Sequence, residues 1–445
     1  MKLQPLPAKA RLALSHPSPS IEAYEGSVRS GKTVATLIDW ARYIRTGPAG
    51  QLAMCGRTER TIINNLILPM QEMFGPSRVR INYGSGVVTV FGRKVHLYGA
   101  NNEQARTKIQ GATLAGAYVD EASTLPESFF NMLYTRLSVP GAKLWLTANP
   151  EGPKHWLKTK WLDKARVWVD GKGRVIEQPA DVSLELHRYT FLLDDNDALD
   201  PAYVDRTKRS YSGVFRRRYI DAEWVAAEGS VYDQFDEDRH VIPFAETPQI
   251  ARVLAAGIDY GTTNPTSALI LGLTAEQHPR LVFLDEYRHD PETHGKLTDA
   301  EQSRRIRAFL AGRHHPSQAL PQPPYTVIDP AAASLKVQLH HDGHHGIWDA
   351  ANEVLPGIKL MSSLIATDQL LITDRCKGLI TELPGYVWDD KKTEKGIDAP
   401  VKQNDHSCDA ARYAVFTTQS LWHGSLRHAL EVTDAPQSRH RMAAA

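Results

Sequence analysis

Eight consecutive residues near the N-terminus match the phosphate-binding pattern G-x-x-x-x-G-K-[ST]: Gly26, Ser27, Val28, Arg29, Ser30, Gly31, Lys32 and Thr33. In such a loop, glycines let backbone N–H groups turn toward phosphate oxygens, and the lysine reaches the β- and γ-phosphates. The hydroxyl of Thr33 is the expected Mg²⁺ ligand. Apolar residues at helical spacing follow over 33–44, so a helix N-terminus would face the phosphates. The pattern predicts a site for ATP and Mg²⁺; the alternative is a chance match in a turn.

Two adjacent carboxylates, Asp120 and Glu121, follow an apolar run that begins at residue 114. Such a run predicts a buried strand, and the carboxyl ends of parallel strands are where ligands bind. We expect Asp120 to hold Mg²⁺ through its water shell and Glu121 to polarise the attacking water. Asn149 ends the next apolar run, where its amide would sense the γ-phosphate. A plain turn before Pro150 is the alternative.

Basic residues raise two further questions. Arg29, inside the phosphate loop, would stabilise transition-state charge, contact a neighbouring subunit, or simply be solvated. The stretch 206–219 contains six basic residues and no acid: Arg206, Lys208, Arg209, Arg216, Arg217 and Arg218. A contact with DNA phosphates, an interdomain surface and a solvated face are all compatible with this stretch.

Three aspartates in the second half of the chain are candidates for a metal-dependent centre. Asp259 ends an apolar run before a tight turn, Asp329 ends the run 326–329, and Asp409 lies in a predicted helix. Together they would hold two divalent ions roughly 4 Å apart, which stabilise the attacking and leaving oxygens in phosphodiester cleavage. Carboxylates favour Mg²⁺ or Mn²⁺. The alternative is that each aspartate is a helix cap or a surface charge.

Two neighbours of these aspartates keep open roles. His406 shares a helix face with Asp409 and would act as a proton shuttle or a ligand, although a single histidine is usually neither. Glu286 would supply a fourth carboxylate or form an ion pair with Arg288.

The surrounding patterns predict the elements that position these residues. In the first half, strands are predicted at 51–55, 114–123 and 142–150, a hairpin at 87–99 and a helix at 59–74. In the second half, strands are predicted at 253–273, 280–289 and 326–329, and helices near 298–312, 334–341, 362–380 and 405–420. The alternation predicts an α/β protein with two domains. We place an N-terminal arm at 1–20, the domains at 21–225 and 251–425, a linker at 226–250 and a C-terminal tail at 426–445.

Composition excludes several classes of protein. With 445 residues, 42% hydrophobic and 23% charged, the chain is neither collagen, nor a disulfide-stapled mini-protein, nor wholly disordered. A net charge of +1 argues against a histone-like basic coat. Three widely separated cysteines favour a reducing compartment. The N-terminus has no apolar core of signal-peptide length, and nowhere do 18 apolar residues run together. We therefore expect neither secretion nor a membrane span.

Taken in order, the motifs resemble those of the large terminase subunit of tailed bacteriophages, from about residue 20 to residue 420. The resemblance rests on EGSVRSGKT, YVDEAS, LTANPEGPKHW, AEWVAAEGSVYDQF, GIDYGTTNP, VIDPAA, ELPGYVWDD and NDHSCDAARYA. It implies an N-terminal additional-strand P-loop ATPase with a parallel-rich sheet and a C-terminal, mixed α/β RNase H-like nuclease. Such a protein packages viral DNA into a preformed capsid and cuts the concatemer.

The resemblance also implies roles for particular residues. It places Lys32 and Thr33 in the phosphate loop, Asp120 on the metal, Glu121 as catalytic base and 147–149 as the coupling segment. In the nuclease it places three aspartates on the metals, with a histidine nearby: Asp259, Asp329, Asp409 and His406. The adenine-binding segment is not obvious, and Tyr24 or the proline-rich arm would supply it.

The implied partners are double-stranded DNA, a portal ring, a small terminase subunit and further copies of the chain in a ring on the procapsid. The implied place is the cytoplasm of the host cell during virion assembly. One rival reading is a helicase–nuclease of DNA repair, which would need a second motor lobe that the motifs do not supply. Another is a capsid-docked scaffold with an inactive C-terminal domain.

Overall fold

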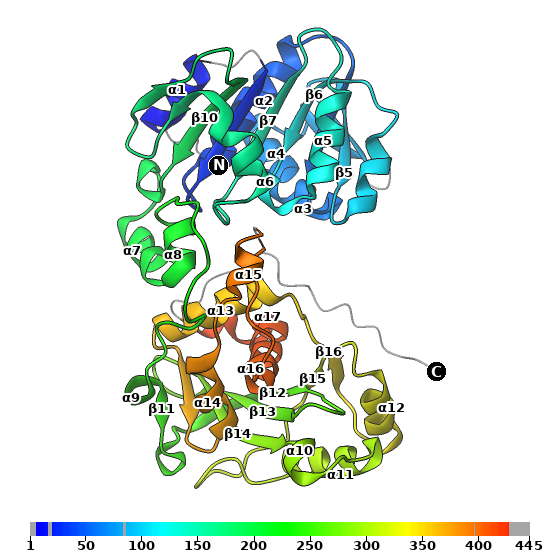
Figure 1. The fold of residues 1–445 in the computed structure, drawn as a ribbon, viewed down its shortest axis with the longest axis vertical. Coiled ribbons are helices and arrows are strands. Elements are labelled where there is room, and N and C mark those ends of the chain that lie inside the picture. The colour runs from blue at the N-terminus through cyan, green and yellow to red at the C-terminus, as the bar shows by residue number, and fades with distance from the viewer. Residues whose placement is uncertain (1–5, 17–19, 83–85, 396, 427–445) are drawn as a thin grey trace. The chain divides into compact units, whose positions relative to one another are not determined.

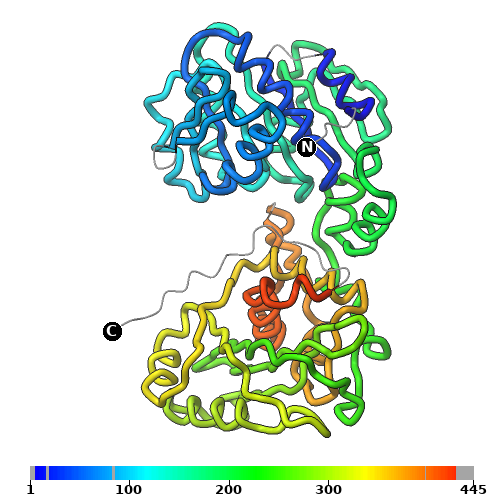
Figure 2. Tube along the Cα trace, turned by 180° about the vertical axis from the view of Figure 1, so that it is seen from behind, coloured from blue at the N-terminus to red at the C-terminus, as the bar shows by residue number. Residues whose placement is uncertain are grey.

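The structure, a computed structural model, describes residues 6–16, 20–82, 86–395 and 397–426. The chain divides into two compact units. The first is built mainly from Met1–Val204 and Val214–Ala226, and the second mainly from Ala227–Thr393 and Asp398–Ala445. In Figures 1 and 2 the first unit is coloured mainly blue to green and the second mainly green to red.

The first unit is centred on a mostly parallel sheet. Within the described residues its strand order is β3-β4-β5-β2-β6-β7-β1-β10-β8-β9. The strands are β1 (Ile21–Gly26), β2 (Gln51–Gly56), β3 (Val79–Asn82), β4 (Val87–Val90), β5 (Arg93–Gly99), β6 (Leu114–Val119), β7 (Lys143–Ala148), β8 (Ala165–Val169), β9 (Val175–Glu177) and β10 (Leu184–Phe191). Neighbours from β5 to β8 are parallel, and the hairpin predicted at 87–99 forms the antiparallel pair β4–β5.

Helices precede, connect and follow these strands. They are α1 (Ala8–Ser15), α2 (Lys32–Thr46), α3 (Glu59–Ile62), α4 (Leu68–Phe74), α5 (Glu127–Arg136), α6 (Trp156–Lys160), α7 (Pro201–Arg209) and α8 (Gly213–Tyr219). A π-helical turn, Ile63–Ile67, joins α3 to α4, so the helix predicted at 59–74 is continuous. Helix α2 confirms the predicted helix after the phosphate loop.

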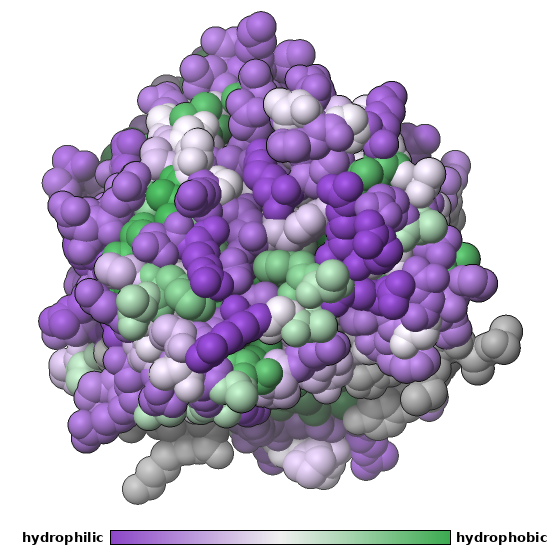
Figure 3. Space-filling model, turned by 90° about the horizontal axis from the view of Figure 1, so that it is seen from below, coloured by the Kyte–Doolittle hydropathy of each residue, from purple (hydrophilic) through white to green (hydrophobic). Residues whose placement is uncertain are grey.

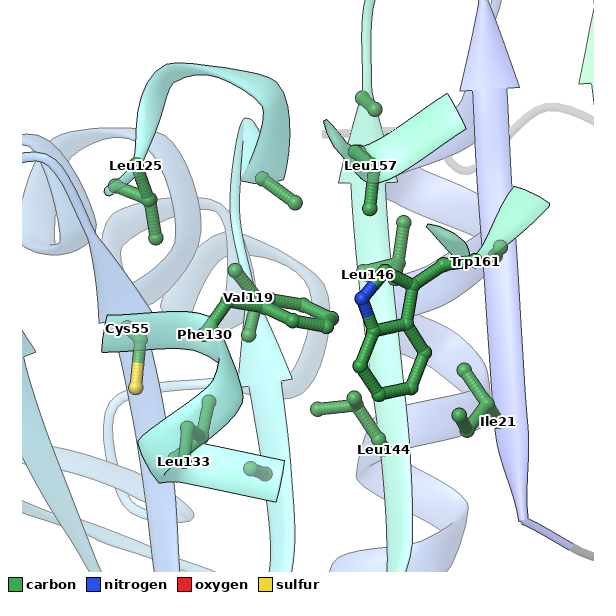
Figure 4. Close-up of a cluster of buried hydrophobic side chains, with 14 of the residues drawn as sticks. Ile21, Cys55, Val119, Leu125, Phe130, Leu133, Leu144, Leu146, Leu157 and Trp161 are labelled. Carbon is green, nitrogen blue, oxygen red and sulfur yellow. The ribbon is translucent and has the colours of Figure 1, made fainter. Parts of the chain in front are cut away.

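The core of the first unit lies against the central strands. Phe130 from α5 packs edge-to-face on Trp161, with ring centroids 5.1 Å apart. Both rings cover the strand residues Val119, Leu144 and Leu146 (Figure 4). The strands are apolar on this face and on the opposite one, as expected for a parallel sheet covered by helices.

The N-terminal arm placed at 1–20 was expected to be extended or poorly ordered, but it contains helix α1. Ala10 and Ala13 of this helix are buried against Tyr24 and Phe191. Lys9 is also buried, and its ammonium donates to Oδ2 of Asp195 at 2.7 Å. The four prolines of this region suggested a loose chain, but an alanine-rich helix with one small-residue face can dock on a sheet.

The second unit contains a mixed sheet with the order β11-β17-β14-β13-β12-β15-β16 among the described residues. The strands are β11 (Val241–Ile242), β12 (Ile250–Asp259), β13 (Thr266–Thr274), β14 (Leu281–His289), β15 (Thr326–Ile328), β16 (Ile347–Asp349) and β17 (Leu370–Thr373). The meander β12–β13–β14 is antiparallel, and parallel strands flank it on both sides. This α/β class, with one parallel-rich and one mixed sheet, agrees with the predicted fold class.

The helices of this unit include α9 (Glu237–His240), α10 (Pro291–His294), α11 (Asp299–Leu310), α12 (Ala333–His341), α13 (Val354–Ala366), α14 (Lys377–Gly385), α15 (Asp390–Thr393), α16 (His406–Thr417) and α17 (Gln419–Trp422). The single helix predicted at 362–380 is wrong, because strand β17 separates α13 from α14. A short apolar run cannot be assigned to helix or strand by periodicity alone.

The stretch expected as a linker, 226–250, is partly built into the second sheet. Strand β11 pairs in parallel with β17, and the N–H of Val231 donates to the carbonyl of Tyr386 at 2.8 Å. Two-residue strands leave no alternating pattern, so sequence could not reveal this one. The expected tail, 426–445, lies outside the described residues except for Leu426.

The surface in Figure 3 is mainly hydrophilic, and its apolar residues form small scattered patches. Among the described residues, no helix combines the length and apolar character needed to cross a lipid bilayer.

Candidate functional site

The phosphate loop lies between β1 and α2; the helix after it was predicted, and the strand before it was not. Gly26 has φ 126°, and a Cβ there would meet the carbonyl oxygen of Phe191 at 2.1 Å. Gly31 also has positive φ, at 84°, and ends the loop at the N-terminus of α2. The N–H of Ser27 donates to Phe191 and that of Val28 to Tyr219. Any other residue at position 26 would displace backbone, so the start of the loop requires glycine.

Lys32 lies inside the site rather than in solvent. Its ammonium donates to the carbonyl of Ser27 at 2.9 Å and to Oδ1 of Asn149 at 2.7 Å. Burial lowers the pKa of Lys32 to about 8, and the carboxylates of Glu121 and Asp120 oppose that shift. The phosphate loop and the end of β7 are therefore joined by one side chain, and Asn149 is not a plain turn residue.

Asp120 and Glu121 are held at the end of β6 by the neighbouring strand β7. The hydroxyl of Thr147 donates to Oδ1 of Asp120 at 2.8 Å and accepts from the N–H of Glu121 at 3.0 Å. Burial raises the pKa of Asp120, although the hydrogen bond from Thr147 lowers it. Glu121 has φ 47°, a left-handed conformation that is uncommon for glutamate. The two carboxylates thus lie two strands from the phosphate loop, with β7 between them.

Four other loop residues and Tyr24 also have defined positions. Ser27 and Ser30 are buried, whereas Thr33 is half-buried in the first turn of α2. Arg29 is exposed, with φ 55°, and its carbonyl accepts from the Asn196 amide at 2.8 Å. Tyr24 is fully buried between Tyr189 and Phe191. It therefore cannot offer its ring to an adenine in this structure.

Asp259 and Asp329 are brought together by strand pairing. Strands β12 and β15 are parallel neighbours in which Ile258 pairs with Ile328. Each aspartate is the next residue along its strand, so both carboxylates lie at the same edge of the sheet. Strands far apart in the sequence therefore supply two acids to one place.

Helix α16 adds Asp409 and His406 to this edge. A Cβ on Gly257 would lie 2.1 Å from the carbonyl oxygen of Ala410, so glycine lets the helix backbone lie directly on β12. Nδ1 of His406 lies 2.8 Å from Oδ2 of Asp259. Asp405 is the residue just before α16, and the N–H of Asp409 donates to its carbonyl at 2.7 Å.

Each of the three aspartates has a side-chain partner. Asp409 accepts from Nζ of Lys402 at 2.8 Å and from Arg412 at 2.8 Å. Asp329 accepts from the hydroxyl of Tyr413 at 2.8 Å. Lys402 also lies 3.1 Å from Asp405. Sequence reasoning missed all three partners; Arg412 and Tyr413 follow Asp409 at helical spacing, but nothing in the sequence indicated Lys402.

These contacts set the protonation of the site. Burial raises the pKa of Asp259, even though His406 opposes the shift. The hydrogen bond to Asp259 raises the pKa of His406. Burial also disfavours the charged form of Asp409, but Arg412 and Lys402 outweigh it and hold the pKa of that carboxyl below its usual range.

The donor set suits a hard divalent cation, because it consists of carboxylate oxygens from two strands and a helix. Across the described ranges, no group of three or more His, Cys, Asp or Glu side chains is arranged to hold a metal ion as it stands. In this structure Lys402, His406 and Tyr413 hydrogen-bond to the carboxylates of Asp409, Asp259 and Asp329, respectively. A metal ion here would have to replace the ammonium or imidazole contacts.

Glu286 does not pair with Arg288, and its role as a fourth carboxylate stays a prediction. Its carboxylate accepts from the N–H groups of Gly378 and Leu379, at 2.6 and 3.2 Å, and from the hydroxyl of Ser407. Arg288 pairs instead with Glu382, at 2.7 Å. Glu382 in turn accepts from the N–H groups at the start of α16. This network holds the helix that carries Asp409.

The basic stretch is not a single surface. Arg218 is 2% exposed, and its guanidinium donates to the carbonyl of Val225. It also lies 3.5 Å from Glu151. Arg216 and Arg217 are exposed, and Arg217 pairs with Glu223 at 2.9 Å. Arg218 is thus a structural residue and cannot belong to a DNA-binding surface.

Comparisons with known proteins agree on one family. The family model described as "Terminase large subunit, T4likevirus-type, N-terminal" matches residues 23–239. The chain is 23% identical over 304 residues to the large terminase subunit of Escherichia phage T5; this match covers 65% of the chain and 62% of the relative, so it spans less than two thirds of that protein.

Solved structures match over a greater length. The large terminase of a thermophilic bacteriophage is 32% identical, with a TM-score of 0.80, and the match covers 94% of this chain and 99% of that one. Structures of the same thermophilic phage protein bound to ADP and to ATP-gamma-S match with TM-scores of 0.79 and 0.77. Their identities are 32% and 33%, covering 93% and 92% of this chain and 99% and 98% of theirs.

Proposed function

The chain belongs to the family of bacteriophage large terminase subunits, and on that premise we propose that it is an ATP-driven motor subunit that packages double-stranded DNA and cuts it with a metal-dependent nuclease. In this proposal the first unit, with its phosphate loop, is the ATPase domain. The second unit, with its three aspartates, is the nuclease domain.

The ATPase proposal rests on the contacts of Lys32. Lys32 lies in the loop region after β1, and Asp120 and Glu121 follow β6, with β7 between these two parallel strands. Ligands of such folds bind at the carboxyl ends of the strands. We assign the β- and γ-phosphates of ATP to residues 26–33, Mg²⁺ to Thr33 and Asp120, and activation of the attacking water to Glu121. The complexes of the thermophilic phage terminase with ADP and with ATP-gamma-S support nucleotide binding by a protein of this fold. Arg29 is exposed in the loop and would stabilise transition-state charge.

Coupling to movement would begin at Asn149. Lys32 donates to Oδ1 of Asn149 at 2.7 Å. When the ammonium turns to the γ-phosphate, this bond is exchanged for a phosphate contact, which releases the end of β7. Because Thr147 on the same strand holds Asp120, the state of the phosphates is transmitted to the carboxylate strand through two hydrogen bonds.

The nuclease proposal rests on the register of β12 and β15, which supplies Asp259 and Asp329 side by side, with α16 adding Asp409. Bound Mg²⁺ or Mn²⁺, as two ions, would stabilise the oxygens of the scissile phosphate. His406 lies against Asp259. It would hold or release a proton at Nδ1 as the Asp259 carboxylate exchanges His406 for a metal ion. Lys402 neutralises Asp409 until that exchange.

The wider assembly follows from the family. We propose that the chain acts in a homo-oligomeric ring on the procapsid, with a portal ring and a small terminase subunit as partners, in the host-cell cytoplasm. DNA held through its phosphates can slide, because those contacts carry no sequence information.

The two active sites are tested in the full chain by variants that separate them. Lys32→Ala and Glu121→Ala should abolish ATP turnover and leave Mn²⁺-dependent linearisation of circular plasmid intact. Asp259→Ala and Asp409→Ala should do the reverse. Asp368→Ala is a matched control, since this exposed aspartate pairs with Arg239 outside the site.

Each alternative has its own outcome in these assays. Retained ATP turnover in both N-terminal variants contradicts the ATPase site, and retained cleavage in both aspartate variants contradicts the nuclease site. A repair helicase would unwind forked DNA. A scaffold would neither hydrolyse ATP nor cut DNA.

A further inference from the structure

A groove of about 650 Å³ opens beside the three aspartates, within the second unit. Its walls come from the end of β14, from α14 and from the segment 401–404 that leads into α16. The residues that matter for its chemistry are Arg288, Lys377, Glu382, Gly385, Gln403 and Asn404.

Strand pairing places this groove at the edge of the sheet that carries the acids. Asp259 pairs with Ser267, and Ser267 pairs with Arg288 on the next strand. Asp329, the residue directly after β15, lies on the opposite side of Asp259. Asn404 directly precedes Asp405 and α16. The groove therefore lies on the β14 side of the aspartates, and the segment 401–404, which leads into α16, lines it.

The groove presents positive charge and hydrogen-bond donors. Lys377 is exposed, and among the described residues it has no carboxylate partner. The amides of Gln403 and Asn404 are exposed as well. Glu382 is the only acid in the lining, and its charge is already used by Arg288 at 2.7 Å and by two N–H groups of α16 at 2.7 and 3.0 Å.

The shape of the groove also favours a chain-like ligand. A Cβ on Gly385 would meet no heavy atom within 4 Å, so the groove is open there. At Gly378 a Cβ would lie 2.4 Å from the carboxylate of Glu286, so the start of α14 packs tightly against β14 in the lining of the groove. A repeating anion with spaces between its charges suits an open channel with separate donors better than one compact pocket.

We propose that this groove binds the sugar–phosphate backbone of the DNA strand that the nuclease cuts, on the β14 side of the scissile bond. Lys377, Gln403 and Asn404 contact the flanking phosphates. The inference rests on the proposed nuclease for the position of the cut, whereas its claim of DNA binding is tested separately. Phosphate contacts of this kind position a strand without reading its sequence.

Binding is measured in the full chain carrying Asp259→Asn, so that the DNA stays intact. A labelled short duplex with single-stranded ends is titrated by fluorescence anisotropy over a range of KCl concentrations. Lys377→Glu should raise Kd about tenfold and reduce the slope of log affinity against log salt by about 1. Asn404→Asp, which preserves the shape of the side chain, should weaken binding several-fold.

One control, Arg239→Glu, and one further groove variant, Asn404→Gly, accompany these substitutions. Arg239→Glu reverses an exposed charge near Asp368, at the other end of the sheet, where Leu281 pairs with Leu370. It should leave Kd and the slope unchanged. Asn404 has φ 50°, so Asn404→Gly removes the amide while retaining the backbone conformation. Thermal unfolding of every variant checks that it is folded.

A direct contact is tested with Gln403→Cys. The natural cysteines, Cys55, Cys376 and Cys408, are all buried, so the new thiol is the reactive one. DNA carrying a thiol-reactive group on one phosphate should crosslink to it near the cut and not elsewhere.

Unchanged Kd and slope in both Lys377→Glu and Asn404→Asp would overturn the proposal and leave the groove to a protein partner. Absence of the crosslink would overturn it as well. If the wild-type chain cuts no plasmid with Mn²⁺ but Lys377→Glu still lowers the salt slope, the proposed nuclease fails and the DNA groove stands.

Discussion

Nδ1 of His406 lies 2.8 Å from Oδ2 of Asp259, which joins the first turn of α16 to the end of β12. The two residues are 147 positions apart in the sequence. The contact raises the pKa of His406, while burial keeps the pKa of Asp259 raised as well. A proton and a metal ion therefore compete for the same carboxylate in the proposed nuclease.

The first prediction concerns this competition. His406 normally titrates near 6.5, and its raised pKa keeps it charged to higher pH. Its contribution to stability is complete below about 6.5 and is lost as pH rises through the raised pKa. Mn²⁺ affinity should therefore rise with pH over that window in the wild-type chain. In His406→Gln the rise should be shallower, as measured by electron paramagnetic resonance of free Mn²⁺. Superimposable pH profiles would contradict the competition.

A second prediction follows from Lys32, whose pKa burial lowers to about 8. Phosphate binding favours the charged ammonium, so a nucleotide should bind with uptake of up to about half a proton near this pH. Affinity should fall as pH rises through about 8 and the lysine becomes neutral. Calorimetry of ATP-gamma-S binding in buffers of different ionisation enthalpy measures the uptake. Lys32→Arg, which stays charged, should take up no proton from this group; equal uptake by both proteins would exclude Lys32 as its source.

Gly257 provides a third test, because a Cβ there would lie 2.1 Å from the carbonyl of Ala410. Gly257→Ala should push α16 off β12 and lower the free energy of unfolding by about 2–4 kcal/mol. Mn²⁺ binding should weaken with it, since Asp409 moves away from Asp259. Gly424→Ala is the matched control, because a Cβ there meets no heavy atom within 4 Å. Equal stability of the two variants in urea denaturation would show that the close approach is not needed.

Arg218 gives the fourth prediction. Arg218→Ala removes a buried guanidinium from Val225 and Glu151 and should cost about 2–3 kcal/mol of folding free energy. DNA affinity of the folded fraction should not change. Arg217→Ala, in an exposed pair with Glu223, should cost less than about 1 kcal/mol. If folded Arg218→Ala bound DNA more weakly and with a smaller salt slope, Arg218 would be a DNA contact and the prediction would be wrong.

Local patterns in the sequence were enough for the first site. The spacing of Gly26, Gly31, Lys32 and Thr33, with the apolar pattern over 33–44, predicts a phosphate loop followed by a helix. The structure contains this loop and α2, together with the unpredicted strand β1 before them. The strands before Asp120 and Asn149 were also predicted, because buried parallel strands are continuous apolar runs. Such features depend on residues close together in the chain.

Pairings between distant segments were decided by the tertiary structure alone. Of the two roles expected for Glu286, the ion pair with Arg288 is wrong, because Arg288 pairs with Glu382 while α14 and Ser407 hold the carboxylate of Glu286. Strands β11 and β17 were missed because two to four residues carry too little periodicity to separate a strand from a helix. Buried Arg218 looks like its exposed neighbours in sequence, since burial depends on what packs against a side chain.

Sequence alone determined which residue types are present for each proposed reaction and which stand at the ends of strands. It also placed Asp259, Asp329 and Asp409 in suitable local settings. Only the tertiary structure decided that β12 pairs with β15 in the register that aligns the first two, and that Gly257 lets α16 bring the third. Register and close helix approach arise from contacts between segments far apart in the chain, and local propensity carries no information about them.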